Sequence, residues 1–142
     1  MSKTLSIILQ PFSITFILLA LITNQWDCGG LFTTCLQNYQ TLSIILILFL
    51  CIGITLLIIA FILDLITICT ETLDFNPSYA TIRLIVLLIG LISICIAISS
   101  YTIQMKHQFS CLMCTIGIVF SVQVALINLI LSRCIHRNQS NI

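Results

Sequence analysis

The chain has 142 residues, of which 60% are hydrophobic and only 6% are charged. Water-soluble domains carry about 25% charged residues, so five Lys and Arg and four Asp and Glu residues cannot cover a soluble globule of this length. The mean hydropathy of +1.24 therefore excludes an ordinary soluble domain, and the net charge of +1 leaves no basic face for nucleic acid.

Four charge-free stretches are long enough to cross a bilayer, whose core of about 30 Å requires about 20 apolar residues per helix. They run from Leu5 to Trp26, from Leu42 to Leu63, from Leu84 to Met105 and from Cys111 to Leu131. Every charged residue lies in a connection or a tail. We predict an all-α fold, a single domain over residues 1–142 built as a four-helix transmembrane bundle. The first stretch is expected to be a retained helix bent near Pro11, not a cleaved signal peptide.

The distribution of Lys and Arg predicts the orientation of the bundle. Four of these residues fall on the side of the termini, and only Lys106 falls on the other side; the four are Lys3, Arg83, Arg133 and Arg137. The positive-inside rule then places both termini in the cytoplasm. The glycosylation sequon that begins at Asn138 should stay unused. We expect the plasma membrane, with the endoplasmic reticulum as the alternative.

Small residues recur at helical spacing in the third and fourth stretches, which is typical of close helix packing in lipid. We expect these residues to form facing seams of one bundle; they are Gly90, Ser93, Ala97 and Ser100 in the third stretch and Cys114, Gly117, Ser121, Ala125 and Asn128 in the fourth. Gln123 and Asn128 should point at a neighbouring helix, because an unpaired amide in hydrocarbon costs several kcal/mol. We interpret Asn128 as an interhelical hydrogen-bonding group. The stretches contain no ionisable residue, which argues against a proton-coupled carrier or an ion pump.

The eight cysteines fall into three groups by position. Cys51 and Cys95 lie within spans and should act as small apolar side chains. Cys69 and Cys134 lie at the predicted cytoplasmic edge, and Cys134 is the better candidate for lipidation because basic residues flank it. The other four share the predicted oxidising side: Cys28, Cys35, Cys111 and Cys114.

Cys28 and Cys35 are expected to form a structural disulfide. Gly29 and Gly30 permit the tight reversal that a short bridged loop needs. The closed loop has eight residues and would stabilise the fold by roughly 2.5 kcal/mol on the chain-entropy model. We expect no metal and no cofactor.

The first loop carries a family motif. Trp26, followed by Gly30-Leu31-Phe32-Thr33-Thr34-Cys35, resembles the W…GLW-x-x-C signature of the claudin and peripheral myelin protein superfamily, with Phe32 in place of the second Trp. The layout is similar too: four helices, cytoplasmic termini, Arg83 near the start of the third helix and a short second outer loop. Family members have a first outer segment of about fifty residues that forms a β-sheet, whereas some fifteen residues here cannot build one.

This truncation decides which family role the resemblance implies. The β-sheet makes the barrier and pore contacts of claudins, so a barrier role is not expected here. Superfamily members without barrier function serve as auxiliary subunits or adaptors, and we expect a non-enzymatic subunit of a larger channel, transporter or adhesion assembly. The C-terminal residues Ser140 to Ile142 have the form of a PDZ ligand.

An alternative uses the cysteines as an electron relay. Vitamin K epoxide reductase and its relatives are four-helix membrane proteins with a loop cysteine pair and a Cys-x-x-Cys at the outer start of the fourth helix, which Cys111 to Cys114 resembles. In that case Cys111 or Cys114 would attack quinone as a thiolate and exchange with Cys28 and Cys35. We favour the claudin-like interpretation because its motif is the rarer pattern. A third alternative is a homo-oligomeric adhesion or scaffold protein.

Overall fold

A computed structural model describes residues 2–26, 28–70, 76–104 and 109–139 of the chain. Its elements are α1 (Ser2–Ile22), α2 (Thr34–Asn38), α3 (Gln40–Cys69), α5 (Pro77–Gln104) and α6 (Phe109–Gln139). The described residues contain no β-strand, only an isolated bridge between Trp26 and Gly29. The predicted all-α class is confirmed.

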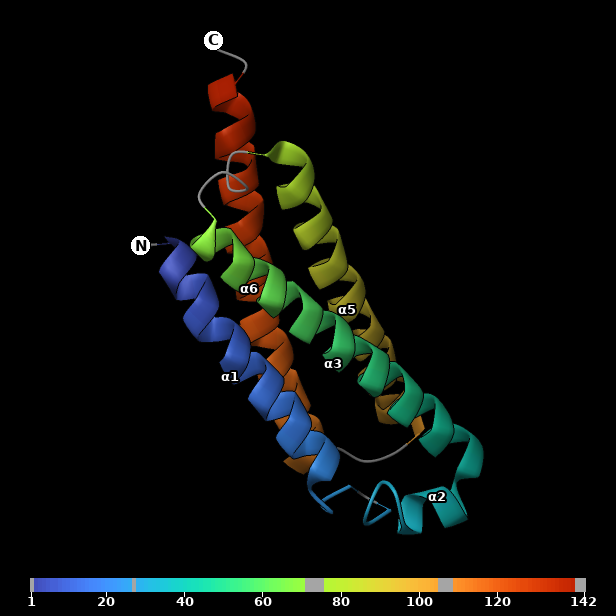
Figure 1. Cartoon of the computed structure of the whole chain (residues 1–142). Coiled ribbons are helices and arrows are strands. Elements are labelled where there is room, and N and C mark those ends of the chain that lie inside the picture. Colours follow the sequence, from blue (N-terminus) through green and yellow to red (C-terminus); the bar gives the residue numbers. More distant parts are fainter. Residues whose placement is uncertain (1, 27, 71–75, 105–108, 140–142) are drawn as a thin grey trace.

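The four long helices form an antiparallel bundle (Figure 1). α3 packs most extensively against α5 and α1 against α6, while α5 with α6 and α1 with α3 form the smaller contacts. Both termini lie at one end of the bundle, which we call the terminal end; residues 23–26 and 28–39, which include α2, lie at the opposite end, the loop end.

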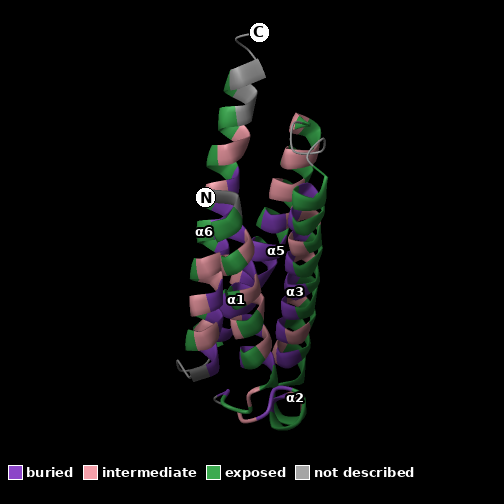
Figure 2. Ribbon diagram, turned by 60° about the vertical axis from the view of Figure 1, so that its left-hand side comes forward, coloured by how far each residue is buried: buried purple, intermediate pink, exposed green. Residues whose placement is uncertain are grey.

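All four long helices contain segments long and apolar enough to cross a membrane: Thr4–Ile22, Gln40–Cys69, Pro77–Gln104 and Ser110–Cys134. Buried residues line the faces that meet inside the bundle, and exposed residues cover the outward faces (Figure 2). Many of the exposed residues are Ile and Leu, which suits a surface that meets lipid. The protein is thus an integral membrane protein with four candidate spans.

The helix boundaries correct the placement of the charged residues. Asp64 lies in α3 and Arg83 in α5, not in the connection between them, and Lys3, Arg133 and Arg137 lie in α1 and α6. The predicted second stretch stops before Asp64 and the predicted third stretch starts after Arg83, because both were defined as free of charge. A helix, however, continues as long as its backbone is hydrogen-bonded and its side chains find partners. The expectation that every charge lies outside the helices is therefore wrong. The first helix is instead shorter than predicted at its C-terminal end: α1 ends at Ile22, four residues before the predicted boundary at Trp26.

Close approach of backbones fixes which helices pair. A Cβ on Gly90 of α5 would lie 3.0 Å from the Cβ of Leu56 and 3.2 Å from the carbonyl oxygen of Gly53, both in α3. A Cβ on Gly117 of α6 would lie 2.6 Å from Cγ1 of Ile17 in α1. The glycines of the two small-residue stripes therefore lie against other helices, Gly90 against α3 and Gly117 against α1. Asn128 of the α6 stripe does contact α5, through Arg83.

The α1–α6 contact also carries interhelical hydrogen bonds. Ser13 Oγ donates to the carbonyl oxygen of Gly117 at 2.7 Å and is hydrogen-bonded to Ser121 Oγ. Both serine side chains are buried. Small polar groups thus find partners across the helices, as the lipid environment requires.

Candidate functional site

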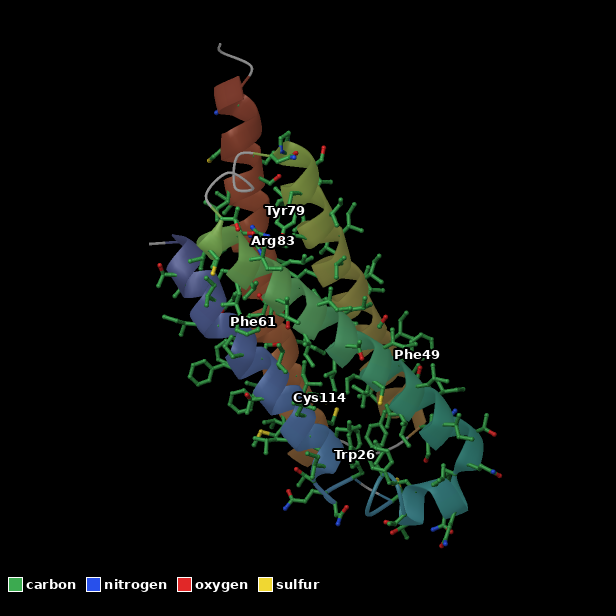
Figure 3. All side chains as sticks on the ribbon, in the orientation of Figure 1. Trp26, Phe49, Phe61, Tyr79, Arg83 and Cys114 are labelled. Atoms are coloured by element: carbon green, nitrogen blue, oxygen red, sulfur yellow. A yellow bond between two sulfur atoms is a disulfide. The ribbon has the colours of Figure 1, made fainter. Side chains whose placement is uncertain are left out.

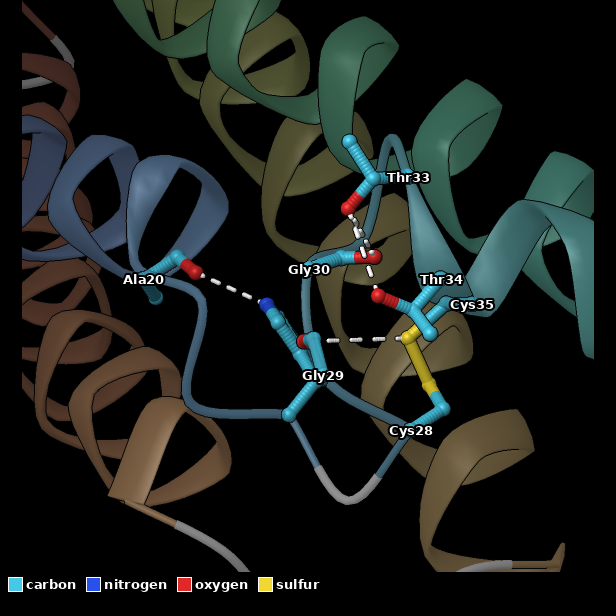
Figure 4. The surroundings of a disulfide bond; sticks show 8 residues. Ala20, Cys28, Gly29, Gly30, Thr33, Thr34 and Cys35 are labelled. Atoms are coloured by element: carbon cyan, nitrogen blue, oxygen red, sulfur yellow. Dashed lines mark hydrogen bonds between the residues drawn. A yellow bond between two sulfur atoms is a disulfide. The ribbon is translucent and has the colours of Figure 1, made fainter.

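The first loop is closed by a disulfide between Cys28 and Cys35, whose Cα atoms are 4.9 Å apart (Figure 4). Gly29 adopts a φ of +97°, a left-handed conformation that favours glycine. Its N–H donates to the carbonyl oxygen of Trp26 at 2.8 Å, which turns the chain back on itself. The predicted disulfide pair is confirmed.

Trp26 fixes this loop to the bundle. Its side chain is 3% exposed, and the indole Nε1 donates to the carbonyl oxygen of Ala20 in α1 at 3.0 Å. The ring also packs edge-on against Tyr101 of α5, with centroids 4.8 Å apart. Figure 3 shows Trp26 at the loop end, beside the last turn of α1. The loop is therefore packed against α1 and α5.

The loop residues from Gly30 to Cys35 include buried residues and one exposed aromatic ring. Leu31 and Cys35 are buried at 1% and 0% exposure, and Gly30 is buried as well. Phe32 is 53% exposed. Position 32 thus presents an aromatic side chain on a loop that is held on both sides.

Cys111 and Cys114 lie in the first turns of α6, with exposures of 3% and 0%, and both carry free thiols. Figure 3 shows Cys114 inside the bundle above the loop end. Reactive cysteines require access and an electropositive surrounding, whereas cysteines buried among apolar side chains are inert. In this structure both side chains belong to the hydrophobic core.

A second cluster lies at the terminal end, where Arg83 joins three helices. Its Nη1 is 2.8 Å from Oδ1 of Asp64 in α3, and its Nη2 donates to Oδ1 of Asn128 in α6 at 3.1 Å. Asp64 and Asn128 are 4% and 3% exposed. We call these three residues the polar junction. Close to it, Tyr79 Oη donates to the carbonyl oxygen of Leu63 at 3.1 Å and adds a further α5–α3 contact (Figure 3).

The polar junction was not foreseen from the sequence. Arg83 was predicted only to contribute to the charge asymmetry and to lie near the start of the third helix, and Asp64 was predicted to lie in a connection. The signal was present, because an acid near the end of one helix and a base near the start of the next antiparallel helix come level across a short connection. The inference from an absence of ionisable residues in the spans is corrected accordingly, since both residues lie in candidate spans.

The two amides of α6 behave differently. Asn128 makes the expected interhelical hydrogen bond. Gln123 is exposed, so the expectation that it points at a neighbour is wrong. It lies off the helix face that turns inward, which includes Ser121, Val124 and Asn128.

The predicted packing residues of α5 and α6 are buried, and the candidate lipidation site is exposed. Gly90, Ser93 and Ala97 are buried in α5, and Gly117, Ser121 and Ala125 are buried in α6. Cys134 is exposed near the terminal end. The PDZ-like residues Ser140 to Ile142 lie outside the described residues.

Comparison of the chain with models of protein families, with curated proteins and with solved structures gives no match in any of the three. The functional interpretation therefore depends on the residues themselves, that is, on the held loop with its exposed Phe32 and on the polar junction.

Proposed function

We propose that this protein is a non-enzymatic, claudin-like tetraspan subunit that packs against a larger integral membrane protein and stabilises, traffics or modulates it. Its termini face the cytoplasm and its disulfide loop faces the oxidising side, most simply at the plasma membrane. The partner is a channel, a transporter or an adhesion assembly.

One observation carries the proposal: a rigidly held loop presents Phe32. The disulfide, the Trp26 hydrogen bond and the packing on Tyr101 hold the residues on either side of it, while Phe32 itself is 53% exposed. A contact that is ordered before binding loses little conformational entropy when the partner arrives. Aromatic side chains are also enriched among the residues that dominate interface energies.

The outward helix faces supply a second contact surface of the kind a partner helix can use. Exposed Ile and Leu side chains follow α3 and α5 along most of their length. Helices in lipid associate through close packing, which small residues permit, and the three helical glycines, Gly53, Gly90 and Gly117, already lie against neighbouring helices of the bundle. We therefore expect Phe32, not a glycine seam, to be the main determinant of partner choice.

The burial of Cys111 and Cys114 supports this proposal over a quinone-linked thiol oxidoreductase. Such an enzyme needs an accessible thiolate that attacks the quinone and then exchanges with the loop disulfide. The two proposals make opposite predictions for the cysteine pairing in cells.

The test is the size of the native assembly after mild extraction from the membrane in which the protein is made. We expect the 15.9 kDa chain to migrate with a larger protein, and a Phe32→Ser variant to lose most of this association. Ile103→Ser is the matched control, because Ile103 is 83% exposed near the same end of the bundle. Extraction of the unaltered chain only as a free monomer would overturn the proposal.

A further inference from the structure

A small cleft lies beside the polar junction, where all four long helices contribute side chains. Its volume is about 10 Å³, close to the smallest volume that holds one water molecule. Its lining consists of Ser6 and Ile7 of α1, Asp64, Thr67 and Ile68 of α3, Arg83 of α5 and Asn128 of α6. The lining of the cleft therefore combines five polar side chains with the two apolar side chains of Ile7 and Ile68.

Several polar atoms around this cleft lack a hydrogen-bond partner among the described residues. They include Asp64 Oδ2, Asn128 Nδ2 and Ser6 Oγ, on side chains that are all at least nine-tenths buried. Buried polar groups in folded proteins are nearly always hydrogen-bonded. Three such groups around one cleft indicate that a further molecule completes their hydrogen bonds.

The charges around the cleft restrict what this molecule can be. Arg83 and Asp64 neutralise each other across 2.8 Å, so the cleft carries no net charge to attract an ion. A hard metal cation would need a shell of oxygen ligands and would face the guanidinium group, while an anion would face the carboxylate. The unused groups are an acceptor on Asp64 and a donor on Asn128, and a hydroxyl group both donates and accepts.

We propose that the cleft binds one neutral hydroxyl group, which donates to Asp64 Oδ2 and accepts from Asn128 Nδ2. Ser6 Oγ lies on the same cleft and completes its hydrogen bonding with this group. The hydroxyl thereby links α1 to the three helices that Arg83 already joins. This inference does not depend on the proposed function.

The hydroxyl has two sources, water and the alcohol headgroup of a neutral lipid. α3 has 30 residues and is about 45 Å long at 1.5 Å per residue, which exceeds the bilayer core of about 30 Å. Asp64 is five residues from the last residue of α3, or about 7.5 Å at the same rise. A centred α3 thus brings Asp64 level with the boundary of the core, where water and lipid hydroxyls both occur. Ile7 and Ile68 would contact the chain of a lipid.

The test is solid-state NMR of the full chain in phosphatidylcholine liposomes, with the side-chain amides of Asn and Gln labelled with ¹⁵N. Transfer of magnetisation from water protons to Asn128 Nδ2 reports a bound water. Gln10 is the internal control, because its amide is also buried, at 1% exposure, and donates to Leu57 instead of lining the cleft. We expect transfer to Asn128 to be severalfold faster than to Gln10.

A second sample containing ¹³C-labelled diacylglycerol distinguishes the sources. A contact between the labelled glycerol carbons and Asn128, with loss of the water signal, assigns the site to a lipid hydroxyl; an unchanged water signal assigns it to water. Ser6→Val should abolish either signal while leaving the Gln10 resonance in place, which shows that the bundle is still folded. Absence of both signals in the unaltered chain, or a shift of Asn128 only on addition of Na⁺ or Mg²⁺, would overturn the proposal.

Discussion

Arg83 contacts two other helices through one ion pair and one hydrogen bond. Removing one partner of a buried pair leaves the other charge unpaired, which costs about 3 kcal/mol or more. We therefore expect Asp64→Leu and Arg83→Met each to reduce the free energy of unfolding by about this amount. The double variant should lose less free energy of unfolding than the two single variants lose in sum, because it leaves no unpaired charge. Unfolding titrations in mixed micelles measure the difference, and simple additivity would show that the pair contributes no coupling.

Trp26 combines burial with one hydrogen bond, and the two contributions can be separated. Trp26→Phe removes the indole donor to Ala20 and should cost about 1 kcal/mol. Trp26→Ala also removes the packing on Tyr101 and should cost about 3–5 kcal/mol. The same unfolding titration gives both values. Equal costs for the two variants would mean that the ring contributes nothing beyond its N–H group.

At the scale of helices, two glycines set the pairing of the bundle. Gly90→Val should push α5 away from α3, since even a Cβ would lie 3.0 Å from Leu56, and we expect a loss of about 1–3 kcal/mol from this overpacking. Ile89→Val is the matched control, because the neighbouring Ile89 is 50% exposed. The readout is the distance between spin labels on the outward faces of α3 and α5, which should increase only for Gly90→Val. A similar increase in the control would contradict the assignment of Gly90 to this contact.

Hydropathy predicted the four spans because lipid imposes the same requirement on every transmembrane helix, namely about 20 apolar residues. The disulfide loop was predictable for a similar reason, since Gly29 and the two cysteines are close in sequence. The pairing of Gly53 with Gly90 was not predictable, because a glycine in an apolar run does not reveal which helix lies opposite. The ion pair was not predicted for a different reason: hydropathy places a charged residue outside a span, whereas Asp64 and Arg83 are acceptable within helices because they meet each other.

For the whole molecule, the cysteines provide the test between a subunit and a redox enzyme. After thiols are trapped in intact cells, mass spectrometry should find Cys28 bonded to Cys35 in nearly all molecules, and Cys111 and Cys114 as unmodified thiols, as in the structure. The buried thiols should react only after unfolding. A fraction of Cys28 or Cys35 bonded to Cys111 or Cys114 would instead demonstrate electron exchange, and the protein should then be assayed with a quinone.

The same cells test the orientation of the bundle. If the terminal end faces the cytoplasm, an impermeant maleimide should label the exposed Cys134 only after the cells are permeabilised. Asn138 should carry no glycan. Labelling of Cys134 on intact cells, together with a glycan on Asn138, would invert the topology and place the disulfide loop in the reducing compartment.

The central claim is that Phe32 contacts a larger membrane protein, and photo-crosslinking tests this contact most directly. A photoreactive phenylalanine analogue is incorporated at position 32 in intact cells, with position 103 as the control, since both side chains are exposed near the loop end. We expect one dominant adduct between position 32 and a larger integral membrane protein, and only lipid adducts at position 103. Adducts of position 32 with lipid alone, or with a second copy of this chain, would contradict it.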